Sequence, residues 1–281
     1  MQTNTYEGLH IVNKAQSITT DKLVVEAPLQ ININSEAYTV VMWTPDNDQD
    51  LVLGLLYAED IYKNSLPIPF EIVEEKYGIP SIINVTITPG ILGKGYLNKR
   101  TLLSVSSCGI CGKQQLEDIE VHGNKIDQKI SFSSESLLGM FAPLQKHQET
   151  FKKTGGSHAA GIFDTHFNLL TIREDIGRHN AVDKCVGSLL QKKSLKSGMY
   201  LLVSGRVSYE IVSKAFLAKI PVIVAVSACS SMAVDFAKEF GICLIGFTRE
   251  NKMTVYANPS FLETKIGVWA QKKYMHNHLK N

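Results

Sequence analysis

The stretch YLLVSGRVSYEIVSKAFLAKIPVIVAVSACSSMAVDFAKEFGICLIGF, residues 200–247, decides the expected fold. Three short apolar runs, at 200–204, 221–226 and 242–247, have the length of buried strands. The two segments between them carry apolar residues at helical spacing: Ile211, Val212, Ala215 and Phe216, then Met232, Ala233, Phe236 and Phe240. Strands that alternate with helices of about a dozen residues imply crossover connections. We therefore predict a largely parallel sheet that is covered on both faces by helices.

The chain just before this stretch fits the same domain. HAAGIF and LLTI, on either side of DTHFN, predict a β-hairpin, and the apolar spacing over 179–190 predicts a helix. Upstream, a helical region through 141–153 is expected to end at Gly155 and Gly156, because glycine accepts the left-handed conformation of a helix end. The second part of the chain is thus predicted to be a three-layer α/β domain.

The first part of the chain is richer in predicted strands. Apolar residues alternate with polar ones on both sides of Asn34-Ser35-Glu36, which predicts a hairpin within 23–42. Thr44 and Pro45 are expected to cap and begin an amphipathic helix. The segments 82–88 and 102–106 are predicted to be extended. We divide the chain into a smaller β-rich domain, 1–130, and an α/β domain, 131–281.

Composition excludes some classes of protein. The 281 residues are 44% hydrophobic and 20% charged, with a formal net charge of +2, so electrostatics give no reason to expect nucleic-acid binding. The first ten residues contain no apolar stretch of signal-peptide length, and the longest apolar run, 220–226, is too short to cross a bilayer. Five cysteines, an odd count, suit reduced thiols better than a disulfide framework. We expect a cytoplasmic protein without membrane contact.

The stretch SSCGICGK places Cys108 and Cys111 just after a predicted strand, each followed by glycine. Structural zinc needs four ligands, and the chain has no second C-x-x-C pair, so no metal site is predicted. A thioredoxin-type pair would begin a helix, whereas this pair follows a β-rich segment, which argues against a thioredoxin-type role. The flanking glycines favour a loop whose thiol visits two partners, and an inert exposed pair is the alternative. The remaining cysteines, Cys185, Cys229 and Cys243, are expected to have no catalytic role.

Basic residues follow several predicted strands. REDIGRHNAVDK (173–184), SGRVSYE (204–210) and GFTRENK (246–252) each join a strand end to glycine and arginine. Ligands of open α/β sheets bind outside the carboxyl ends of the strands, so these segments favour an anionic ligand such as a nucleotide. For 173–184 a capped helix with a solvated charged turn is equally compatible. His158 in GGSHAAG is similar to the zinc ligand of deaminases. However, Ala160 stands where their acid-base glutamate would be and no P-C-x-x-C follows, so deamination is not predicted.

Together these segments resemble one family, the formate dehydrogenase accessory sulfurtransferases, or FdhD family. The resemblance extends from about residue 25 to 256. It rests on the segments EAPLQININ, TPDNDQDLVLGLLYAEDI, SSCGICGK, TGGSHAAG, REDIGRHNAVDK, SGRVSYEIVSKA, IPVIVAVSA and GFTRENKMTVY. It implies a cytidine-deaminase-like fold for the α/β domain, a homodimer, and a protein that receives sulfur from a cysteine desulfurase as a persulfide. The sulfur would pass to the molybdenum bis(molybdopterin guanine dinucleotide) cofactor, which formate dehydrogenase requires.

The resemblance also implies roles for individual residues. Cys108 matches the persulfide-forming cysteine and Cys111 the auxiliary one. The segment matching the family's cofactor-binding segment is Phe247, Thr248, Arg249, Glu250, Asn251 and Lys252. Glu250 and Asn251 depart from the glycine or small residue expected there, and Cys229 is unusual at its position.

Three functions remain open at this point. As a sulfurtransferase, the protein would use the Cys108 thiolate to take the outer sulfur of the desulfurase persulfide and deliver it to the bound cofactor. A chaperone would bind the cofactor without transferring sulfur and would tolerate the loss of Cys108. A dithiol reductase would need Cys111 as much as Cys108.

Overall fold

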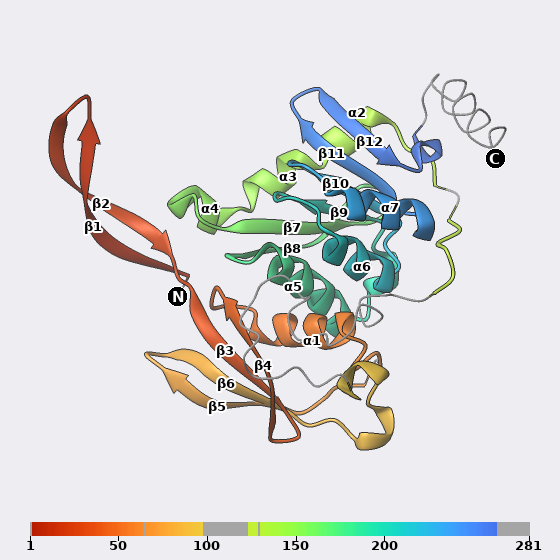
Figure 1. Ribbon diagram of the computed structural model, residues 1–281, viewed down its shortest axis with the longest axis horizontal. Coiled ribbons are helices and arrows are strands. Elements are labelled where there is room, and N and C mark those ends of the chain that lie inside the picture. The colour runs from red at the N-terminus through yellow and green to blue at the C-terminus, as the bar shows by residue number, and fades with distance from the viewer. Residues whose placement is uncertain (1, 65, 98–122, 129, 263–281) are drawn as a thin grey trace.

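The computed structural model describes residues 2–64, 66–97, 123–128 and 130–262. They form three sheets with helices between and around them: a two-stranded ribbon, a four-stranded sheet and a six-stranded sheet (Figure 1). Within the described ranges, single turns of 3-10 helix lie at Pro89–Ile91, Lys94–Leu97, Leu195–Ser197 and Pro259–Phe261. The predicted strand over 102–106, Cys108 and Cys111 lie outside the described residues.

The six-stranded sheet has the order β12-β11-β10-β9-β7-β8. Its strands are β7 (His158–Phe163), β8 (Leu169–Asp175), β9 (Tyr200–Val203), β10 (Val222–Ala225), β11 (Cys243–Arg249) and β12 (Lys252–Ala257). The three strands predicted from residues 200–247 are confirmed as β9, β10 and β11. The predicted largely parallel sheet is wrong, because only β9, β10 and β11 run parallel while β7, β8 and β12 pair antiparallel. The reason is connection length, since short turns join β7 to β8 and β11 to β12.

Helices cover both faces of this sheet, which confirms the three-layer prediction (Figure 1). One face carries α5 (Arg178–Gln191), α6 (Tyr209–Leu217) and α7 (Ser231–Phe240); the other carries α2 (Ser134–Gly139), α3 (Phe141–Lys146) and α4 (Glu149–Thr154). Strand β9 shows the division, because Leu201 and Val203 pack with α5 and α6 while Tyr200 and Leu202 pack with α2 and α3. Gly155 ends α4 at φ 66°, as predicted. The likeness to cytidine deaminases stays a prediction.

The β-rich first part is also confirmed. Its sheet has the order β4-β3-β6-β5, with strands β3 (Ala27–Ile33), β4 (Glu36–Trp43), β5 (Phe70–Lys76) and β6 (Ile79–Val85). The predicted hairpin turns at Asn34 and Ser35, whose φ angles of 53° and 67° match the twist of paired strands. Leu29, Ile31 and Ile33 are fully buried against α1 (Asp48–Ala58).

Helix α1 begins later than predicted. It starts at Asp48 after Asn47, which has a left-handed conformation, so the expected cap at Thr44 and start at Pro45 are wrong. The structure gives the reason: Thr44 is bonded to the α/β part of the chain. Its N–H donates to Asp175 Oδ2 (3.1 Å), and its hydroxyl accepts from the N–H of Ile176 (3.0 Å).

A buried seam joins the two parts of the chain. We use this name for Thr44, Asp50, Arg173, Asp175 and Lys184. Lys184 Nζ lies 2.7 Å from Asp175 Oδ2, and Arg173 Nη2 lies 2.7 Å from Asp50 Oδ2. Helices α1 and α5 approach so closely beside the seam that a Cβ at Gly54 would lie 1.9 Å from the Asp183 carbonyl oxygen. The boundary proposed at residue 130 stays a prediction.

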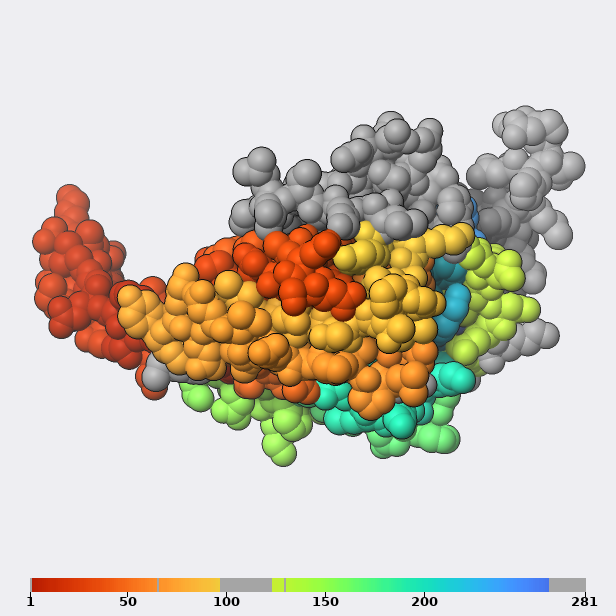
Figure 2. All heavy atoms as spheres, turned by 90° about the horizontal axis from the view of Figure 1, so that it is seen from below, coloured from red at the N-terminus to blue at the C-terminus, as the bar shows by residue number. Residues whose placement is uncertain are grey.

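The two-stranded ribbon was not predicted from the sequence. It consists of β1 (Thr3–Val12) and β2 (Ala15–Val24), which turn at Asn13 and Lys14. We call it the arm, because it projects from the body of the molecule in both views (Figures 1 and 2). Within the described part of the chain, no helix combines the length and hydropathy that a bilayer crossing requires.

Candidate functional site

The carboxyl ends of β9, β10 and β11 meet at one edge of the six-stranded sheet, because these strands are parallel neighbours. The segments at these ends are the loops 204–208 and 226–230 and the tip of the β11–β12 hairpin, 246–252, which is counted here as a third loop. Strand β7 begins at the same edge, since Ala160 pairs with Val203, and β7 brings His158 to it. We call these three loops, together with His158 and Arg178, the strand-end edge. It is the position at which open α/β sheets bind ligands.

Backbone hydrogen bonds tie the three loops together. The N–H of Val207 donates to the carbonyl of Ala228, and that of Ser230 donates to the carbonyl of Val207, both at 3.0 Å. The N–H of Phe247 donates to the carbonyl of Ser227, also at 3.0 Å. Loops bonded in this way have their backbones fixed relative to one another before a ligand arrives.

The predicted cofactor-binding segment, 247–252, forms the end of the β11–β12 hairpin. Gly246 pairs with Thr254 and Arg249 pairs with Lys252, so two residues of β11 oppose one of β12 in a bulge. The bulge turns the Phe247 ring outward, at φ 51° and 40% exposure, while Thr248 is fully buried. Arg249 and Lys252 are exposed side by side. This hairpin therefore presents two cations and an aromatic ring at the strand-end edge.

Glu250 occupies the turn of this hairpin at φ 56°. This left-handed conformation favours glycine, which accounts for the small residue that the family resemblance leads one to expect here. The chain keeps the turn despite its glutamate. Asn251, beside it, is exposed.

A second group of cations surrounds His158. A Cβ at Gly205 would lie 3.2 Å from His158 Nδ1 and 3.5 Å from Arg178 Cβ, so glycine permits this close approach. Burial, and then the charge of Arg178, lower the pKa of His158, which keeps the imidazole neutral near pH 7. Arg178 Nε is buried and has no hydrogen-bond partner among the described residues. Buried donors are nearly always paired in proteins, so this corner suits an acceptor supplied by a ligand.

The residues of the motif REDIGRHNAVDK lie in two regions, the buried seam and the strand-end edge. Arg173, Asp175 and Lys184 are seam residues, and Glu174 accepts from the N–H groups of Thr150 and Phe151 at the start of α4, both at 2.8 Å. The alternative of a solvated charged turn is therefore wrong for most of the motif, since these groups are bonded and largely buried. Anion binding remains open for Arg178.

His179, in the same motif, lies beneath the edge. Its ring is 3% exposed, and Nε2 is 3.0 Å from Ser208 Oγ and 3.5 Å from Glu210 Oε2. Below it, Lys214 Nζ is 2.8 Å from Asp183 Oδ1. This buried chain of polar groups was not predicted from the sequence. Its signal was the presence of charged residues at positions that otherwise follow the apolar spacing of α5 and α6.

The three described cysteines are poor nucleophiles. Burial raises the pKa of Cys185 and of Cys243 to about 12, and that of Cys229 to about 11. The nucleophilic form of cysteine is the thiolate, which is scarce near neutral pH at such values. Cys185 and Cys243 are buried hydrophobic residues, as predicted, and Ser230 caps α7 by accepting from the N–H of Ala233.

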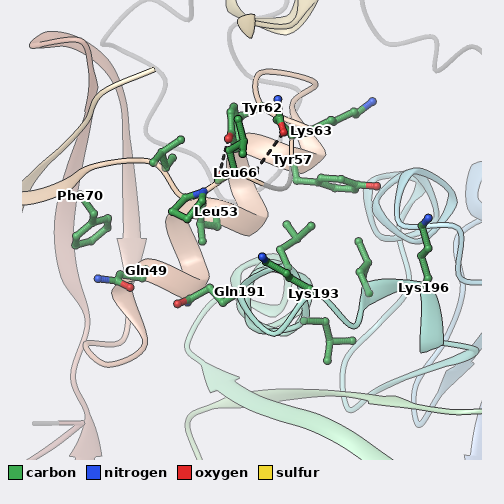
Figure 3. A pocket seen from close by; sticks show the side chains of 16 residues that line it. Gln49, Leu53, Tyr57, Tyr62, Lys63, Leu66, Phe70, Gln191, Lys193 and Lys196 are labelled. Atoms are coloured by element: carbon green, nitrogen blue, oxygen red, sulfur yellow. Dashed lines mark hydrogen bonds between the residues drawn. The ribbon is translucent and has the colours of Figure 1, made fainter. Parts of the chain in front are cut away.

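Metal-ligating clusters and cavities are the other features of the described ranges that could form a site. No group of three or more metal-ligating side chains occurs within the described ranges. A cavity of about 660 Å³ lies between α1, which contributes Leu53 and Tyr57, and the chain around the end of α5, which contributes Lys193 and Lys196 (Figure 3). Its described lining includes no cysteine and no residue of the strand-end edge, so we do not assign it to the candidate site.

Comparisons with known proteins agree on one family. Residues 24–263 match the sequence profile described as the FdhD/NarQ family. The sulfur carrier protein FdhD of Sulfolobus acidocaldarius is 42% identical over 86% of this chain and 92% of its own length. Its namesake from Streptomyces avermitilis is 39% identical over 89% and 92%. A crystal structure from Desulfotalea psychrophila, described as a formate dehydrogenase accessory protein, shares the fold: its TM-score is 0.73 at 20% identity, over 93% of this chain and 100% of that one.

Proposed function

Since the chain belongs to the FdhD/NarQ family, we propose that it is a sulfurtransferase that carries sulfur for the maturation of formate dehydrogenase. In this proposal Cys108 accepts sulfur from a cysteine desulfurase, with Cys111 as its auxiliary. The sulfur passes to the molybdenum bis(molybdopterin guanine dinucleotide) cofactor before that cofactor enters formate dehydrogenase. The cofactor is the cargo of the protein, and the strand-end edge is its proposed binding site.

The chemistry needs one reactive thiol. The Cys108 thiolate attacks the outer sulfur of the desulfurase persulfide, the original S–S bond breaks, and the desulfurase cysteine leaves as a thiolate. The new persulfide is more acidic than a thiol and therefore stays anionic near neutral pH. On delivery its terminal sulfur becomes sulfide on the metal, which supplies two electrons, and Cys108 returns to the thiolate. The three described cysteines, with pKa values raised to about 11 or 12, are unsuited to this exchange.

The observation that carries the cofactor-binding proposal is the excess of cations at the strand-end edge. Arg178, Arg206, Arg249 and Lys252 have no ion-pair partner among the described residues, and Arg178 Nε is buried without an acceptor. Guanidinium groups bind phosphate through paired hydrogen bonds. We assign the phosphates of the cargo to these four side chains and a guanine base to the exposed face of Phe247.

Titration with guanosine diphosphate tests the binding site separately from sulfur transfer. We expect Arg249→Ala to weaken binding about tenfold, through loss of a charge-assisted contact. Lys238→Ala, which changes an exposed lysine of α7, is the matched control and should bind as the wild type does. Equal affinity of the wild type, Arg249→Ala and Lys238→Ala would contradict the placement of the cofactor-binding site at the strand-end edge.

Formate dehydrogenase maturation separates the three possible functions. A sulfurtransferase requires Cys108, so Cys108→Ala should yield inactive dehydrogenase while Cys111→Ala retains part of the activity. A cofactor chaperone would tolerate Cys108→Ala, and a dithiol reductase would lose activity equally in both variants. A homodimer, as the family resemblance implies, is part of the proposal, and sedimentation velocity of the full chain tests it.

A further inference from the structure

The arm is attached to the body only at its base. Gln2 accepts from the N–H of Val25 (2.9 Å), and its side chain bonds to Asp46 (3.2 Å) and Thr150 (2.6 Å). Beyond the base, nearly every residue of β1 and β2 is exposed. Figure 2 shows the arm standing clear of the body. Its ten paired rows thus have solvent on both faces and along both edges.

One face of the arm carries an aliphatic cluster near the tip. Leu9 pairs directly with Ile18, and Ile11 lies two residues further along the same face. Their side chains are 57%, 72% and 59% exposed. A lone two-stranded hairpin is at best marginally stable in water, and an exposed aliphatic cluster on a free ribbon favours association. We therefore expect this cluster to pack against another surface.

The charges on the same face indicate what covers it. Glu7 lies next to the aliphatic cluster on β1, and Lys22, opposite Thr5, is its diagonal neighbour on β2. A face with one acid, one base and an apolar patch is complementary to a copy of itself. If two arms stack on this face about a two-fold axis along their length, each Leu9 meets the partner's Ile18 and each Glu7 comes near the partner's Lys22.

We propose that the arm is a self-association surface, on which the face with Glu7, Leu9, Ile11, Ile18 and Lys22 packs against the same face of a second copy of this chain. The proposal goes beyond the family assignment, because the family match begins at residue 24, where the arm ends. It deepens the proposed homodimer by naming the surface, and the sulfur-transfer chemistry does not depend on it.

Sedimentation velocity of the full chain tests this surface. The wild type should be a dimer, and Leu9→Asp/Ile18→Asp should raise the dimer Kd at least about 30-fold, as loss of a central apolar pair does at other interfaces. The matched control is Tyr6→Asp/Val12→Asp, because these residues lie on the opposite face of the arm with similar exposures of 55% and 54%. The control should remain dimeric.

An exchange of two charges provides a second, independent test. Glu7→Lys should weaken the dimer, because it places like charges together across the two-fold axis, and Glu7→Lys/Lys22→Glu should restore it. Circular dichroism and urea unfolding of each variant verify that the body is folded.

Two results would overturn the inference: a monomeric wild type, and a dimer that tolerates Leu9→Asp/Ile18→Asp. If the monomeric wild type also bound phosphatidylglycerol vesicles through the aliphatic face, that face would be a membrane-binding surface instead. A monomer whose Cys108 still acquires sulfur would overturn this inference and the homodimer while leaving the proposed sulfur transfer intact. A dimer insensitive to the arm variants would reject only the surface.

Discussion

The buried seam and the strand-end edge use the same residue types in opposite ways. In the seam, Lys184 and Asp175 are fully buried and lie 2.7 Å apart, and Lys184 Nζ also donates to the carbonyl of Thr44 at 2.7 Å. At the edge, Arg206, Arg249 and Lys252 are exposed and have no ion-pair partner among the described residues. Segment 173–184 contributes to both regions, so a dense cluster of charges in sequence does not by itself identify a binding site.

The difference lies in whether each charge is already compensated. A buried ion pair with further hydrogen bonds has no capacity left for a ligand, and removing one partner leaves a charge without compensation. At the edge the cations outnumber the one acid, Glu250, and retain their capacity to bind an anion. The two regions should therefore respond oppositely to substitution: the seam through folding stability and the edge through affinity.

The largest expected effect is in the seam. Lys184→Met should lower the free energy of unfolding by about 3–5 kcal/mol, because the buried Asp175 carboxylate loses its ammonium partner. Urea denaturation measures this. Lys238→Met is the control, since it removes an exposed pair with Asp235 at 3.9 Å and should cost at most about 1 kcal/mol. Equal effects of the two substitutions would contradict the description of the seam as structural.

The contact of α1 with α5 should be nearly as sensitive. Gly187→Ala should destabilise the fold by about 1–3 kcal/mol, because its Cβ would lie 1.8 Å from the Asp50 carbonyl oxygen and the helices must separate. Gly139→Ala in α2, with no atom within 4 Å of the added Cβ, should be neutral or slightly stabilising. Thermal or urea unfolding compares the pair, and an unchanged Gly187→Ala protein would reject the close approach.

At the edge the expected change is in affinity. Arg206→Gln should change the unfolding free energy by no more than about 0.5 kcal/mol, since the exposed side chain has no ion-pair partner among described residues. The same substitution should weaken guanosine diphosphate binding severalfold. Calorimetric titration and urea unfolding on one preparation measure both quantities. A destabilised protein with unchanged affinity would show that Arg206 stabilises the fold and does not bind the ligand.

The smallest effect concerns the described thiols. Burial disfavours the thiolate, so a pKa raised to about 11 leaves roughly one Cys229 in a thousand ionised at about pH 8. Iodoacetamide should therefore label Cys229 very slowly, and Cys185 and Cys243 only after unfolding in urea. Peptide mass spectrometry follows each site. Rapid native labelling of Cys229 would show that it is more reactive than its surroundings imply.

Much of the fold could be predicted from the sequence. Strands β9, β10 and β11 follow from apolar runs, and the β3–β4 turn from Asn34 and Ser35, because these signals are local. The arm has no one-sided alternation, since aliphatic residues such as Leu9 and Val12 lie on both of its faces. Thr44 has the sequence features of a helix cap, yet a partner more than a hundred residues away determines its role. Tertiary contacts of this kind leave no local pattern.

The candidate site was predicted less completely. Glycine and arginine after successive strands identified the strand-end edge, because parallel strands bring their ends together. The sequence could not separate Arg178 at the edge from Arg173 in the seam, because what places Arg173 in the seam is its contact with Asp50, a residue 123 positions away. Cys108 and Cys111 lie outside the described residues, so their predicted roles stay predictions.

The most direct test of the account is the location of the transferred sulfur. The protein is incubated with a cysteine desulfurase and cysteine, and intact and peptide mass spectrometry under non-reducing conditions locate any added sulfur. We expect one added sulfur atom on Cys108, its loss on treatment with a thiol reductant, and none in Cys108→Ala. Absence of added sulfur, or its unchanged presence in Cys108→Ala, would contradict the proposed function.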